Sequence, residues 1–137
     1  MATGEPFNVT VTDPEAIFFS SDVERASTFY RRLGFVETFR VPGDGSPIHV
    51  DLELNGYKIG FASIDSSRQD HGLHPASDGQ RATLTLWTGD VRATYGALVE
   101  AGVTSIAEPQ TWLDRLLIAW VADPDGHPIQ LVQPLST

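Results

Sequence analysis

The feature of this sequence that most constrains its fold is an internal repeat. Aligning Asp22 with Asp90, a shift of 68 residues, places Ser21–Val23 on Gly89–Val91. In each copy an apolar run leads into an aspartate suited to cap a helix, and a short segment with helical spacing then ends at a glycine. A repeated unit of this size needs its neighbour to complete a core. The repeat therefore predicts a fold of two similar halves.

Both copies predict the order strand, helix, strand, strand, strand. The expected helices are 23–33 and 91–101, and the expected strands are 16–19, 36–41, 48–54, 57–63, 82–87, 104–108, 115–122 and 128–132. Two independent cores within 137 residues would each approach the size at which a domain becomes marginal. We therefore expect a single α+β domain spanning 1–137, with βαβββ modules at about 15–63 and 82–133 and a polar linker over about 64–81 that lacks apolar periodicity.

The turn in the first module predicts which side chains share a face of its sheet. Asn55-Gly56 is a strong signal for a two-residue hairpin turn and pairs Leu52 with Ile59 on the face that packs under the helix. Because side chains alternate along a strand, His49 and Asp51 then lie together on the opposite face. Two polar side chains two residues apart on one face suit acid–base chemistry or recognition of a ligand's polar group.

The corresponding turn in the second module, Asp123–Gly126, is expected to contain four residues, with proline at the position that presets φ. That turn pairs Trp120 with Ile129. Under this register Trp120 faces the helix and Leu117 lies on the opposite face. We expect the aspartates of this segment to be turn residues, because the spacing of a calcium-binding loop is absent.

Two curved four-stranded sheets, each with its helix on the outer side, are expected to enclose a cavity between their other faces. Phe19 and Trp87 occupy the same position in the two copies, where a pair of rings can hold a flat aromatic ligand. Trp112 is expected in a loop over 109–114 as a lid residue. The expected ligand-binding residues are Phe19, His49, Asp51, Thr83, Thr85, Trp87, Trp112, Leu117 and Gln130.

Charge and composition limit the partners of this cavity. The chain has 18 acidic and 9 basic residues, a net charge of −9, and lacks the clustered basic residues that bind nucleic acid. It has no cysteine, which excludes disulfides and thiol nucleophiles. An apolar run of the roughly 18 residues that span a membrane is absent, as is the pattern of a secretory signal. We expect a cytoplasmic protein whose field favours a cationic small molecule.

Two segments carry a resemblance to a known family. Ser21–Phe35, with Ser-Asp-Val followed by Phe-Tyr and Leu-Gly-Phe, and Asp123–Leu131, with Asp-Pro-Asp-Gly-His-Pro-Ile-Gln-Leu, resemble the vicinal oxygen chelate superfamily. That superfamily includes glyoxalase I, extradiol dioxygenases and bleomycin-resistance proteins. The resemblance covers about 15–133 and implies the fold of two βαβββ modules.

The resemblance also implies where a metal would bind. In the metal enzymes of the superfamily the ligands occupy positions that correspond here to Glu15, Gly60, Thr83 and Gln130. Only Glu15 carries a carboxylate or an imidazole, so we expect no metal cofactor, with Glu15 as a weak candidate ligand.

The resulting expectation is a homodimer that sequesters an aromatic antibiotic or natural product without catalysis, as the resemblance to bleomycin-resistance proteins implies. No catalytic residue is assigned under this interpretation. The alternative is a metal-independent or atypical-metal enzyme, such as a lyase, isomerase or dioxygenase, that uses Glu15, His49 or Asp51 as acid, base or ligand. A dimerisation module with a vestigial pocket is a third interpretation.

Overall fold

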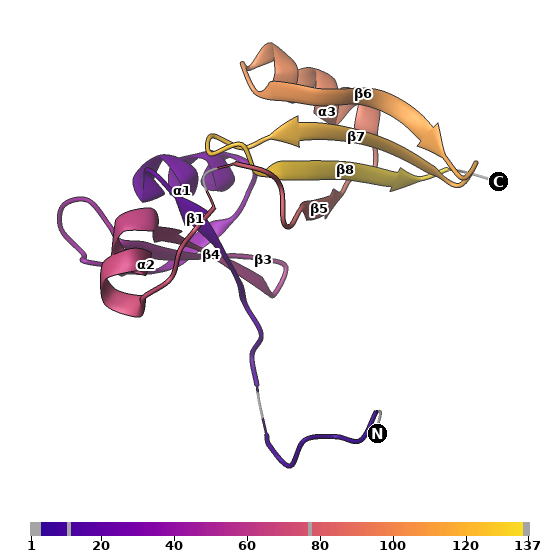
Figure 1. The fold of residues 1–137 in the computed structure, drawn as a ribbon. Coiled ribbons are helices and arrows are strands. Elements are labelled where there is room, and N and C mark those ends of the chain that lie inside the picture. Colours follow the sequence, from indigo (N-terminus) through magenta and orange to yellow (C-terminus); the bar gives the residue numbers. More distant parts are fainter. Residues whose placement is uncertain (1–3, 11, 77, 136–137) are drawn as a thin grey trace.

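The computed structural model describes residues 4–10, 12–76 and 78–135, and Figure 1 shows their arrangement in two modules. None of the helices described is long and apolar enough to cross a membrane. The elements are β1 (Ala16–Ser20), α1 (Val23–Arg32), β2 (Val36–Val41), β3 (His49–Leu54), β4 (Tyr57–Ser63), α2 (Ile64–His71), β5 (Leu84–Trp87), α3 (Val91–Glu100), β6 (Thr104–Trp112), β7 (Leu116–Ala122) and β8 (Pro128–Pro134). The predicted α+β class and the predicted order within each module are confirmed.

The first sheet has the strand order β1-β4-β3-β2, with β1 parallel to β4 and the other pairs antiparallel. The β3–β4 hairpin turns at Asn55 and Gly56, whose φ angles of 52° and 86° are both left-handed, as this two-residue turn requires. The register pairs Leu52 with Ile59. The predicted pairing of this hairpin is therefore confirmed.

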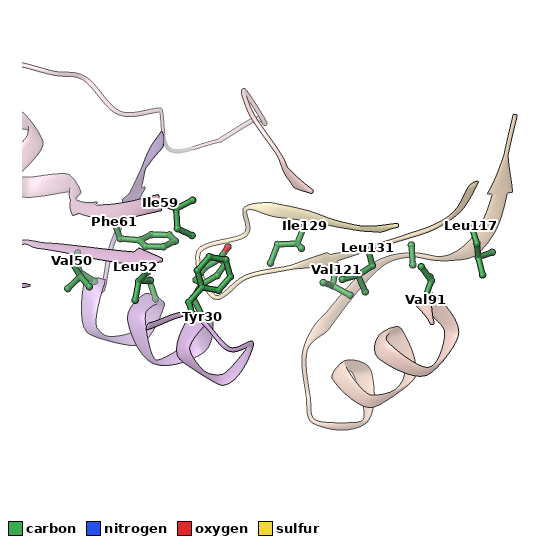
Figure 2. Close-up of a cluster of buried hydrophobic side chains, with 14 residues drawn as sticks. Tyr30, Val50, Leu52, Ile59, Phe61, Val91, Leu117, Val121, Ile129 and Leu131 are labelled. Atoms are coloured by element: carbon green, nitrogen blue, oxygen red, sulfur yellow. The ribbon is translucent and has the colours of Figure 1, made fainter. Parts of the chain in front are cut away.

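Helix α1 covers one face of the first sheet. Its N-terminus is capped by the Asp22 carboxylate, which accepts a hydrogen bond of 3.0 Å from the backbone N–H of Arg25. Ala26 and Tyr30 are buried, and the Tyr30 ring lies against Phe61 of β4 with 4.9 Å between ring centroids (Figure 2). The core of this module thus lies between α1 and the sheet, and the other face of the sheet stays open.

The second sheet has the matching order β5-β8-β7-β6, but the predicted pairing of its last hairpin is wrong by one residue. Trp120 pairs with Gln130 and not with Ile129. The backbone N–H of Asp123 bonds to the carbonyl of His127 at 3.0 Å, so the connection has three residues and not four. Such a slip exchanges the two faces of a strand, because side chains alternate.

The corrected register moves the residues of β7 between the core and the open face. Leu117 and Val121 join the apolar cluster that packs against Val91 of α3, as Figure 2 shows. The prediction that Leu117 lines the ligand-binding face is therefore wrong. Trp120, predicted to face the helix, lies on the open face with its partner Gln130.

The segment expected to be an irregular linker contains a helix, α2. The Ser63 hydroxyl caps its start by accepting a bond of 3.0 Å from the backbone N–H of Ser66, and Gly72 ends it with a left-handed φ of 66°. Capping groups, and not an apolar stripe, delimit this helix. The part of the predicted linker from Ile64 to His71 is therefore helical.

The two sheets lie one beyond the other and do not close into a barrel (Figure 1). Helices α1 and α3 lie on the same side of the two sheets, as both views show. The opposite faces of both sheets are consequently presented on one common side of the chain, and within the chain neither sheet covers the other.

Candidate functional site

A polar joint holds the two modules together, and we use this name for the contacts of Tyr30 with Asp123, of Ser20 and Ser21 with Asp125, and of the Phe19 carbonyl with His127. The buried Tyr30 hydroxyl donates to Asp123 at 2.9 Å, across 93 positions of sequence. Asp125 accepts from the hydroxyls of Ser20 at 2.7 Å and Ser21 at 3.0 Å. Asp123 and Asp125, which the sequence predicts as turn residues, thus also connect the two modules.

Asp123 is the centre of this joint. Besides Tyr30, it accepts bonds from the backbone N–H groups of Asp125 at 2.9 Å and His127 at 2.8 Å. Burial of the carboxyl raises its pKa, and the neighbouring His127 and the hydrogen bonds oppose that shift. Burial and the nearby Asp123 charge also raise the pKa of Tyr30, which keeps its hydroxyl protonated as a donor. The buried polar groups of the joint are therefore hydrogen-bonded, and the joint has a structural role.

The open face of the first sheet carries a second polar group, which we call the Glu15 cluster: Glu15, His49 and Asp51. Glu15 immediately precedes β1, whereas His49 and Asp51 project from β3 on the shared face predicted from the sequence. His49 Nε2 lies 2.6 Å from Asp51 Oδ1. One nitrogen or oxygen from each of the three residues lies within 4.8 Å of the others.

A glycine in the intervening strand lets these side chains converge. Gly60 of β4 pairs with Asp51 on one side and with Ile17 on the other. A Cβ at Gly60 would lie 2.8 Å from Asp51 Oδ1, 3.1 Å from Glu15 Oε2 and 2.6 Å from Ile17 Cδ1. The two carboxyl groups therefore occupy the space that a side chain at Gly60 would take.

The surroundings of Glu15 favour its protonated form. Partial desolvation is the main cause that raises the pKa of Glu15, and the facing Asp51 carboxyl raises it further. His49 and Lys58 act in the opposite direction. Ionisation of either carboxyl group, that of Glu15 or that of Asp51, therefore disfavours ionisation of the other. Carboxyl groups with such shifted pKa values are frequent in functional sites.

The open face of the second sheet carries all three tryptophans of the chain, and we call it the tryptophan face: Trp87, Trp112 and Trp120. Trp87 is 67% exposed and Trp112 is 52% exposed. Trp112 ends strand β6, so the expectation that it lies in a loop is wrong. Strand periodicity located Trp87 on this face, whereas Trp120 was missed because the turn length was misjudged.

Polar residues predicted for this face lie beside the tryptophans. The Thr85 hydroxyl donates to Gln130 Oε1 at 3.2 Å across the paired strands β5 and β8. Thr83, just before β5, is exposed. The structure therefore brings Thr85 and Gln130 together, and their side chains are hydrogen-bonded to each other.

Phe19 and Trp87, expected to face each other, lie in different places within the chain. Phe19 lines a cavity of about 400 Å³ between the modules, together with Ile17, Ile64, Arg81 and His127. Trp87 is absent from its lining and stands on the open face of the second sheet. A sandwich of these two rings by one chain is therefore not formed.

The metal positions implied by the family resemblance do not fit a divalent ion. Gly60 has no side chain, Thr83 offers a neutral hydroxyl, and the Gln130 amide oxygen is used by Thr85. Glu15 is the one carboxylate among the four positions. We derive no chemistry from a metal held in that way.

Comparisons with known proteins agree with this architecture. Residues 10–131 match the model of the Glyoxalase/Bleomycin resistance protein/Dioxygenase superfamily. An uncharacterised protein of Mycobacterium bovis is 36% identical over 121 residues, covering 83% of this chain and 78% of that protein.

Two solved structures show the same fold. A hypothetical protein from S. aureus has a TM-score of 0.76 at 18% identity, covering 91% of this chain and 95% of the other. A lactoylglutathione lyase from Agrobacterium tumefaciens has a TM-score of 0.68 at 14% identity, covering 94% and 96%. The sequence match over most of the chain, the paired βαβββ modules and the shared fold together show that the chain belongs to the glyoxalase/bleomycin resistance protein/dioxygenase superfamily.

Proposed function

We propose that this protein binds a flat, positively charged aromatic small molecule on the tryptophan face and releases it chemically unchanged. The observation that carries the proposal is the placement of Trp87, Trp112 and Trp120 on one open sheet face, two of them more than half exposed. Exposed aromatic side chains gathered on one face mark an interaction site more often than a solvated surface. Indole rings stack on flat ligands and attract cations through their π faces.

Charge supports a cationic ligand. The net charge of −9 raises the local concentration of cations around the chain. The family includes bleomycin-resistance proteins by name, which is consistent with binding of a natural product. A cytoplasmic location stays a prediction from the sequence.

A second copy of the chain is part of this proposal. The open faces of both sheets look to the same side and expose apolar side chains, among them Ile17, Phe39 and Trp87. A partner that lays its first module on this chain's second module covers both faces. In such a dimer we expect the first-sheet face that carries Phe19 to lie over the face that carries Trp87.

The proposal is tested by titrating the protein with a panel of aromatic, amine-bearing natural products and following the heat of binding. For a compound that binds, Trp87→Ala and Trp112→Ala are each expected to weaken binding about five- to thirtyfold, since lost stacking on an indole costs roughly 1–2 kcal/mol. Tyr57→Ala is the matched control, because Tyr57 is 79% exposed but lies at the turn of the first sheet.

Equal affinity of the three variants for the bound compound, or no binding across the panel, contradicts the proposal. The recovered compound is then analysed by mass spectrometry after prolonged incubation. An unchanged mass supports sequestration, whereas a product indicates catalysis on the same face.

A further inference from the structure

The Glu15 cluster differs in composition from a group of surface acids. It combines an imidazole nitrogen with two carboxylates, which come from strand β3 and from the residue just before β1, on either side of β4. Donors bound to one ion at about 2.0–2.4 Å are at most roughly 4–5 Å apart, and the three donors here lie within 4.8 Å of one another. One nitrogen and two oxygens form a donor set that suits divalent first-row transition metals.

Gly60 links this cluster to the family positions that do not fit a metal. Residue 60 is the β4 position at which the family resemblance implies a metal ligand, and here Ile17 and the carboxyls of Asp51 and Glu15 fill the volume that its side chain would take. A Cβ at residue 60 would lie 2.6 Å from Ile17 Cδ1 and 2.8 Å from Asp51 Oδ1, so the ends of these side chains would have to shift to admit it. Gly60 offers no donor on β4, whereas His49 and Asp51 offer donors on the adjacent strand β3.

The charges in the cluster are incompletely compensated by the described residues. Asp51 has one ion-pair partner there, His49, which is charged only when protonated, and Glu15 has no Lys or Arg partner. Lys58, on the same face, stands opposite Glu53 in the register. When both carboxyl groups are ionised they repel each other, and a divalent cation between them removes that repulsion.

The joint provides an internal comparison. Asp123, Asp125 and His127 also bring three donor atoms within 4.8 Å, but these side chains bond to Tyr30, Ser20, Ser21 and backbone groups. Among the described residues the donors of the Glu15 cluster interact with one another, His49 with Asp51 at 2.6 Å and Glu15 with Asp51, and not with serine, tyrosine or backbone N–H groups. The edge contact of the His49 ring with Phe39, 6.1 Å between centroids, also holds that ring in place on the sheet. The two trios therefore differ in what their donors already bind.

We propose that Glu15, His49 and Asp51 form a divalent transition-metal site contained in the first module alone, in which Gly60 provides the room for the ligands. This site is independent of the ligand proposed for the tryptophan face. It develops the sequence-based alternative in which Glu15, His49 and Asp51 are metal ligands, and it differs from the four positions that the family resemblance implies.

The test is titration of the untagged, metal-stripped full chain with Zn²⁺ by calorimetry, and with Co²⁺ by visible absorption. One ion is expected per chain. Glu15→Gln, His49→Gln and Asp51→Asn are each expected to weaken binding at least about tenfold, in line with the 10- to 100-fold losses typical around metal sites. Gly60→Ala is expected to weaken Co²⁺ binding because its Cβ displaces the ends of the Asp51 and Glu15 side chains, and circular dichroism shows whether that variant keeps its fold.

Three controls separate this site from other origins of binding. Glu53→Gln removes one negative charge from the same strand and face, and is expected to leave the affinity unchanged. His71→Gln with His74→Gln removes exposed imidazoles outside the cluster and is expected to have no effect. Thr85→Ala with Gln130→Ala removes polar side chains of the second module.

Each outcome decides the proposal. No saturable binding by the wild-type chain, or full affinity retained by Asp51→Asn and Glu15→Gln, overturns it. Loss of binding in the histidine control assigns the ion to the linker, and loss in the Thr85 and Gln130 control assigns it to a site shared by both modules. Either result also overturns the proposal, and neither bears on binding of an aromatic compound to the tryptophan face.

Discussion

A chain carrying Val121→Asp is expected not to fold, whereas the neighbouring substitution Trp120→Asp is expected to give a folded chain. Val121 is fully buried in the core between β7 and α3. An unpaired carboxylate there costs upward of about 4 kcal/mol, a large part of the stability of a small domain. Trp120 lies on the open face, where an aspartate stays hydrated, so the loss is limited to packing of roughly 1–2 kcal/mol.

Urea unfolding followed by circular dichroism measures both effects. Val121→Ala provides a foldable variant at the buried position, with an expected loss of about 1–3 kcal/mol from the cavity it leaves. If the Trp120→Asp chain proved less stable than the Val121→Asp chain, Trp120 would be the buried residue. That result would support the four-residue turn and contradict the observed register.

The second large effect is expected at the joint: Asp123→Ala is expected to lower the free energy of unfolding by about 3 kcal/mol. The substitution removes the acceptor for the Tyr30 hydroxyl and for the backbone N–H groups of Asp125 and His127. A donor left without a partner on burial costs about 1–3 kcal/mol, and relief of the buried carboxylate offsets part of that cost. Denaturant unfolding measures the change.

A double-mutant cycle with Tyr30→Phe isolates the contact between the modules. Alone, Tyr30→Phe is expected to cost about 1–2 kcal/mol. In the Asp123→Ala background it is expected to cost less, because the hydroxyl then has no acceptor to lose. Additive losses would show that the two residues are not coupled across the joint.

The two hairpins show how much of the fold could be predicted. In the first, Asn55-Gly56 specifies a turn type by its left-handed angles, and the whole register follows from it. In the second, Asp123 closes the turn with both its backbone and its side chain, and Gly126 takes a left-handed φ of 88°. Apolar residues occupy both faces of β7 and β8, so alternation could not correct the error.

The same contrast applies to the site. Strand alternation placed His49 and Asp51 on one face because that inference needs only the local period. The approach of Glu15 depends on the parallel register of β1 with β4, which pairs Ile17 with Gly60 and which no local pattern specifies. Helix α2 was missed although Ser63 and Gly72 are its signals, because its sequence lacks an apolar stripe.

The joint has a consequence for how the chain unfolds. A buried bond between Tyr30 and Asp123 ties the core of one module to the turn that organises the last two strands of the other. Unfolding of either module therefore leaves polar groups of the other module without their hydrogen-bond partners. The loss of these bonds raises the free energy needed to open each module alone. The most protected amide protons of β4 and β8 are thus expected to exchange with the same free energy, through a single opening event of the entire chain.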